Sequence, residues 1–188
     1  MKLATLMVAA GCVVPALTSA AGTNAFNPDI ALILSGTYSD LEQDPATYTL
    51  PGFPLAGETG PGDRGFALGE SELSVSANID PDWYGIMTLA LAPEGGSEVE
   101  NAYVQTSSLG HGLTVRGGRF FSGIGYLNEQ HAHTWDFVDA PLPYRAFLGN
   151  QYKDDGVQLR WVAPTDLYME LGAESIACAN YPAGCNAD

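Results

Sequence analysis

The clearest pattern along the chain is a strict alternation of apolar and polar residues between positions 66 and 79. Four apolar side chains fall on one face of this segment: Leu73, Val75, Ala77 and Ile79. A period of two is typical of a β-strand with one apolar and one polar face. The residues Asp-Pro-Asp at 80–82 then favour a tight turn, so we expect the segment 83–92 to return antiparallel to the first.

The alternation recurs along most of the chain. It predicts further strands at about 28–42, 99–108, 113–121, 155–163 and 167–175. Together with the first two segments these make about seven strands, and no segment has helical periodicity over a useful length. The sequence therefore predicts an all-β fold.

The lengths of the connections indicate which all-β architecture to expect. The segments 43–65 and 122–154 are long, whereas the other connections are short. In an up-and-down meander, both long connections fall at one end of the sheet, which is typical of outer-membrane barrels. Aromatic residues gather near both ends of the strands: Trp83, Tyr84, Trp161 and Tyr168 near the short turns, and Phe66, Phe120 and Phe121 near the long loops. We therefore expect an antiparallel up-and-down transmembrane β-barrel; the alternative is a soluble β-sandwich whose core is the apolar face.

About seven strands make an incomplete barrel. Bacterial outer-membrane barrels usually have even strand numbers, and open edges in lipid leave backbone groups without partners. We expect residues 21–188 to be the N-terminal part of a larger barrel, either a fragment or a truncated gene product.

The first twenty residues predict export. Residues 1–20 hold one lysine, an apolar run and a small-residue end, as a secretory signal peptide does. Oxidising conditions after export would permit a disulfide between Cys178 and Cys185, which bracket a turn-rich segment; a metal-binding pair is the alternative.

The chain is strongly acidic. It has 7 Lys and Arg against 22 Asp and Glu, a formal net charge of −15. Because nucleic-acid phosphates need basic partners, this balance argues against nucleic-acid binding.

Several segments resemble a family of porin-like Gram-negative outer-membrane proteins. The motifs read FALGESELSVSANIDPDWYG, ENAYVQT, LTVRGGRFFSGIGYLNEQHAHTWDFVDAPL and DDGVQLRWVAPTDLYMELG. The resemblance implies a bacterial outer-membrane location and passive diffusion of small hydrophilic solutes or ions. Porins are often homotrimers, so a homotrimer in outer-membrane lipid is the implied assembly. Because relatives of this kind are sometimes labelled TonB-dependent or zinc-regulated receptors, a TonB-linked receptor or transporter, for a metal such as zinc, is the alternative.

The long connection 122–154 holds the candidate site. It is rich in aromatic residues, so we expect it to fold inward against the barrel wall, as a porin constriction loop does. Charged candidates for the pore lining or constriction are Glu70, Glu72, Arg116, Glu129, Asp136, Asp139, Arg160, Glu170 and Glu174. Opposed charges across a narrowing set ion selectivity. Arg119 has the opposite parity to Arg116, and a bulge at 117–118 could re-aim it.

His131 and His133 are the metal candidates. Residues two apart on an extended segment point the same way, so both rings could reach one zinc ion, with Glu129 or Asp136 completing the ligands. The alternative is ordinary loop packing, in which case no cofactor is present. Ser122 has no nucleophile motif around it, and we expect no enzymatic activity.

Overall fold

A computed structural model describes residues 28–49, 51–52, 60–69, 71–92 and 95–179. The predicted signal peptide, Glu70 and Cys185 lie outside the described residues, whereas Cys178 lies within them and is disulfide-bonded. Within the described part, no helix has both the length and the apolar character needed to cross a membrane.

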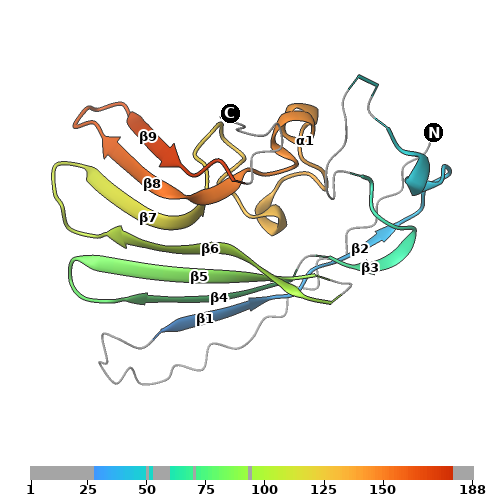
Figure 1. The fold of residues 1–188 in the computed structure, drawn as a ribbon, viewed down its shortest axis with the longest axis horizontal. Coiled ribbons are helices and arrows are strands. Elements are labelled where there is room, and N and C mark those ends of the chain that lie inside the picture. Colours follow the sequence, from blue (N-terminus) through green and yellow to red (C-terminus); the bar gives the residue numbers. More distant parts are fainter. Residues whose placement is uncertain (1–27, 50, 53–59, 70, 93–94, 180–188) are drawn as a thin grey trace.

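The fold is an antiparallel meander (Figure 1). Its strands are β1 (Asp29–Ile33), β2 (Gly36–Ser39), β3 (Gly65–Leu68), β4 (Ser71–Asn78), β5 (Trp83–Leu91), β6 (Ser97–Thr106), β7 (Leu113–Phe121), β8 (Lys153–Val162) and β9 (Glu170–Ile176). Seven described strands form one sheet in the order β1-β4-β5-β6-β7-β8-β9, and every pairing is antiparallel. The predicted all-β fold and the order of its strands are confirmed. The sheet is open, since β1 and β9 each have one neighbour among the described strands.

Two of the predicted strands are interrupted. The segment 28–42 divides into β1 and β2, and the segment 66–79 divides into β3 and β4. β2 and β3 form a separate two-stranded sheet, in which the rings of Tyr38 and Phe66 lie 4.8 Å apart. Where the strands are interrupted, the Gly69 amide donates to the Ser35 carbonyl at 2.9 Å. This hydrogen bond holds the two backbone segments together between the two sheets.

The long connection contains a short helix that the apolar pattern did not predict. α1 (Leu142–Leu148) begins with a proline in its first turn and ends at Gly149, which has a left-handed backbone with φ of 61°. Two short 3-10 segments complete the helical content of the described residues, η1 (Pro45–Thr47) and η2 (Ala132–Thr134). Proline early and glycine at the end are ordinary helix boundary signals, but seven residues are too few to show a periodicity.

The strand register separates an apolar from a polar face. Directly paired residues point to the same side, so the row Val75, Met87 and Ala102 belongs to one face. Exposed apolar side chains on this face come from most of the strands: Ile30, Leu32, Met87, Val104, Leu113, Val157, Leu159, Trp161 and Leu171. In the part of the chain that the structure describes, no second sheet covers them, which distinguishes this arrangement from the predicted alternative of a β-sandwich.

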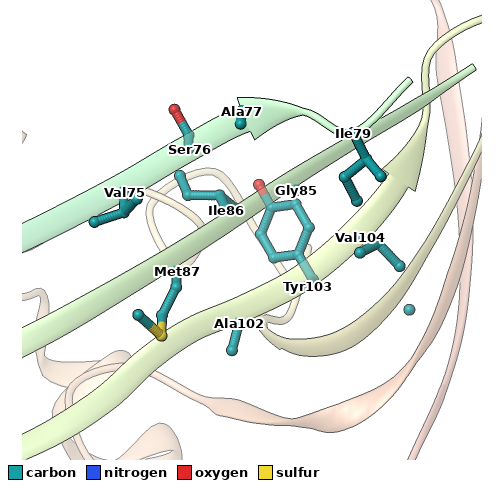
Figure 2. Close-up of a pocket in the computed structure, with 11 residues that line it drawn as sticks. Val75, Ser76, Ala77, Ile79, Gly85, Ile86, Met87, Ala102, Tyr103 and Val104 are labelled. Carbon is teal, nitrogen blue, oxygen red and sulfur yellow. The ribbon is translucent and has the colours of Figure 1, made fainter. Parts of the chain in front are cut away.

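A hollow of about 450 Å³ interrupts the apolar face (Figure 2). It lies over β4, β5 and β6, and apolar side chains such as Ile79, Met87 and Val104 surround it. Gly85 and Gly117 also line it, and because they lack side chains they leave the depression in the surface. The hollow therefore lies on the opposite face from Arg116, Arg160 and Glu170.

Burial in this protein is reversed relative to a soluble domain. Among the described residues, 11 polar or charged side chains are buried against 6 apolar ones. The buried apolar set includes Phe120 and Phe121, which are 0% and 4% exposed. The predicted aromatic belt at the long-loop end is therefore wrong for these two residues, because the long connection covers them. Phe121 instead contacts the ring of His131 edge-on at 5.5 Å.

Candidate functional site

The connection between β7 and β8 folds over the polar face of the sheet. Glu174 on β9 accepts hydrogen bonds from the Ser122 hydroxyl at 2.6 Å and the Gly123 amide at 2.7 Å. Asn128, which is fully buried, donates to the carbonyls of Ser122 and Tyr152 and accepts from the Tyr152 amide. The connection therefore folds against the polar face of the sheet instead of extending away from it.

A group of charged residues lies where this connection meets the sheet. We call Arg116, Glu129, Arg160 and Glu170 the arginine cluster. The Glu129 carboxylate lies between the two arginines, 3.4 Å from Nη1 of Arg116 and 3.3 Å from Nη2 of Arg160. Arg160 also donates through Nε to Glu170 at 2.6 Å. Of the three acidic residues predicted in this connection, Glu129 is the one that contacts Arg116 and Arg160.

Neutral groups hold the arginine cluster in position. The Arg116 guanidinium donates to Gln105 at 3.3 Å and lies 4.3 Å above the centre of the Tyr103 ring. Tyr168 donates its hydroxyl to Glu170 at 2.6 Å, and this bond raises the pKa of Tyr168 above its usual value. Because each guanidinium has fixed partners, the side chains of the cluster are pre-organised.

A second group forms where β4 and β6 meet the same connection. We call Glu72, Glu100, His131 and His133 the histidine cluster. His131 Nδ1 lies 3.0 Å from Glu72 and 3.1 Å from Glu100, and His133 Nδ1 lies 2.8 Å from Glu72. Both carboxylates are buried, at 2% and 3% exposure, and the two rings are 5.7 Å apart.

A β-bulge brings Glu100 into the histidine cluster. The register between β5 and β6 shifts between Thr88 and Leu89, which pair with Asn101 and Val99, so Glu100 has no partner on β5. A bulge can turn two consecutive side chains to one side, and here Glu100 and Asn101 both reach His131. The pairing between β6 and β7 ends at Ala102 and Arg119. Just beyond this pair, His131 contacts Glu100 of β6 and Phe121 of β7.

The surroundings of His131 favour its charged form. Burial by itself lowers the pKa of the imidazole, but the hydrogen bonds to Glu100 and Glu72, together with their charges, raise it to about 9. In this structure His131 is therefore an imidazolium near neutral pH, held between two carboxylates.

The remaining predicted residues have different surroundings. Asp136 and Asp139 are exposed, and the ion pairs of Arg116 and Arg160 involve Glu129 and Glu170 instead. Both histidines contact Glu72 rather than Glu129 or Asp136. Arg119 stays in register on the apolar face and forms a bidentate pair with Asp155, so the bulge expected at 117–118 is absent.

Comparison with known proteins gives little information on function. The chain is 39% identical over 165 residues to an uncharacterized protein of Aquifex aeolicus (strain VF5), a match that covers 83% of this chain. The match covers 35% of that protein, so the chain spans about a third of the length of this relative. Neither a known protein-family profile nor a solved structure matches the chain.

Proposed function

We propose that this chain forms part of the wall and the constriction of an outer-membrane β-barrel channel for small hydrophilic solutes or ions. The observation that carries the proposal is the reversed burial: polar side chains are covered and an apolar face is exposed. A contiguous apolar face on a soluble monomer rarely exceeds a few hundred Å², whereas a barrel wall needs such a face toward lipid.

The dimensions of the strands support the proposal. β5 and β7 have 9 residues, and β6 and β8 have 10. About nine to eleven tilted residues are needed to cross the hydrocarbon core. Trp83, Trp161 and Tyr168 are exposed near the short turns, where aromatic side chains suit a membrane interface. Closure of the barrel requires strands besides these seven.

The inward connection supports a narrowed lumen. It places the Glu129 carboxylate opposite two wall arginines, and opposed charges across a narrowing set selectivity among ions. The net charge of −15 favours cations or neutral solutes over anions. Outer-membrane lipid is then the partner of the apolar face.

Conductance of the complete gene product in planar bilayers tests this function. We expect stable channels with a preference for cations. Glu129→Gln removes the charge between Arg116 and Arg160, so we expect the ratio of cation to anion permeability to fall several-fold. Asp166→Asn, which removes the same charge from an exposed short turn, is the matched control and should change the ratio little.

Two outcomes would contradict the proposal. Correctly inserted protein without conductance would exclude an open channel. Channels whose ion preference is the same for Glu129→Gln and the wild type would place the constriction elsewhere.

A further inference from the structure

We propose that the histidine cluster binds one divalent transition-metal cation, of which Zn²⁺ suits the donors best. Glu72, Glu100, His131 and His133 supply two carboxylates and two imidazole nitrogens. The site requires only the fold of the wall and its inward connection, so it does not depend on the channel function.

The spacing of the donor atoms fits a small cation. In a tetrahedral zinc site with bonds of 2.0–2.1 Å, neighbouring donor atoms are about 3.3 Å apart. His131 Nδ1 is 3.0 Å and 3.1 Å from carboxylate oxygens of Glu72 and Glu100, and His133 Nδ1 is 2.8 Å from Glu72. The donor atoms of Glu72, His131 and His133 all lie within 4.8 Å of one another. The three close pairs are therefore within about half an ångström of the spacing that a tetrahedral cation requires.

Charge and burial favour a divalent ion. Glu72 and Glu100 are almost fully buried, and the positive charge beside them in the cluster comes from imidazole. A divalent cation would balance the charges of both buried carboxylates. Mixed nitrogen and carboxylate donors suit Zn²⁺, while Ca²⁺ and Mg²⁺ prefer oxygen donors alone.

Binding of the cation displaces protons from the imidazole rings. Nδ1 of His131 shares a proton with Glu72 and Glu100, and Nδ1 of His133 shares one with Glu72. When the cation takes their place, both protons leave Nδ1, either to solvent or, in a neutral ring, by transfer of the proton to Nε2. Nε2 of His131 then carries the remaining ring proton and lies 3.0 Å from Nδ2 of Asn101; a half-turn of this amide would place its oxygen there to accept the proton. This second contact fixes the orientation of the ring, as the outer contacts of metal-bound histidines usually do.

The sequence positions of the donors suggest what the cation does. Glu72 belongs to β4 and Glu100 to the bulge of β6, whereas His131 precedes η2 and His133 lies within it, in the connection between β7 and β8. A bound cation therefore links this connection to two wall strands that are distant in sequence, and holds it against the polar face.

Calorimetric titration of the metal-free complete protein in detergent with Zn²⁺ tests the site. We expect one Zn²⁺ per chain, and Co²⁺ at the same stoichiometry with the intense visible absorption of a four-coordinate ion. Glu100→Gln and His133→Gln should each weaken binding by at least about tenfold. His111→Asn is the matched control, since it removes an exposed histidine in a distant turn and asparagine tolerates its positive φ of 52°; it should bind as the wild type does.

A second readout does not depend on the variants. Zn²⁺ should slow proteolysis of the connection 122–152 in the wild type, and Mg²⁺ should not. The proposal is overturned if wild-type protein takes up no stoichiometric Zn²⁺. It is equally overturned if both cluster variants bind as tightly as His111→Asn. Channel conductance is measured separately, so failure of this site and failure of the channel function are distinguishable.

Discussion

Replacement of Gly118 by alanine is expected to destabilise the sheet by more than about 3 kcal/mol. Gly118 has φ of +131°, a conformation that residues with a side chain rarely adopt. An added Cβ would lie 2.2 Å from the Ala102 carbonyl oxygen and 2.8 Å from the Tyr103 Cα. These are backbone atoms of β6, so they can move only if the strand moves.

The location makes that movement costly. β6 and β7 are joined by four paired positions, and Gly118 opposite Tyr103 is one of them. A shift of β6 here also disturbs the Tyr103 ring beneath the Arg116 guanidinium. We therefore expect the substitution to separate the two strands next to the arginine cluster rather than to be absorbed locally.

Gly117 provides the matched control for this prediction. It is the neighbouring glycine on the same strand, but its added Cβ would meet nothing within 4 Å, and its φ lies outside the left-handed range. Gly117→Ala should therefore be nearly neutral. The measurement is the urea midpoint of the folded protein in detergent; equal midpoints for the two variants would contradict the argument.

Much of the fold was predictable because a half-buried strand repeats every two residues. The alternation identified all seven strands of the large sheet, and the lengths of the connections gave the correct end for each loop. The interruptions of the first hairpin were not predictable, since apolar residues continue through Leu34 while the ladder ends at Ile33. Local pattern does not show where a strand leaves one sheet and enters another.

The candidate site was predictable in part. Strand parity places Arg116 and Arg160 on the polar face, but the pattern could not separate Glu129 from Asp136 and Asp139, which are exposed. The partner of His133 could not be predicted, because Glu72 lies 61 residues earlier and only the folded sheet brings the two residues together.

A change in the alternation around Glu100 indicates its position, although the sequence prediction did not include this residue. Glu98 and Glu100 share one parity, whereas the polar residues that follow, Asn101 and Tyr103, have the other. Two consecutive polar residues in a strand mark such a change of phase, and a β-bulge is its physical cause. This criterion would have added Glu100 to the candidates for metal binding.

Loss of the Asn128 side chain is expected to release the inward connection. Asn128 is fully buried and makes three hydrogen bonds of 2.7–2.8 Å to the peptide groups of Ser122 and Tyr152. In Asn128→Ala the Ser122 carbonyl and the Tyr152 amide lose this partner away from water, and each unsatisfied group costs about 1–3 kcal/mol. The two peptide groups mark the beginning and the end of the connection, so the cost opens the connection before it unfolds the sheet.

Limited proteolysis and amide hydrogen exchange of the connection measure this opening. We expect cleavage between 122 and 152 to accelerate roughly a hundredfold, which corresponds to about 3 kcal/mol, while exchange within β4 and β5 stays slow. Gln130→Ala is the matched control, because this amide of the same connection donates to the Tyr126 carbonyl in an exposed contact. Its removal should change cleavage little.

Asn128→Asp separates the contributions of the two halves of the amide. The aspartate keeps an oxygen that can accept from the Tyr152 amide, but it loses both donated bonds and faces two carbonyl oxygens with a negative charge. It should therefore open the connection at least as much as alanine does. Cleavage at the wild-type rate in both variants would mean that Glu174 and the two clusters hold the connection without Asn128. Faster cleavage together with altered conductance would link the position of the connection to the width of the channel.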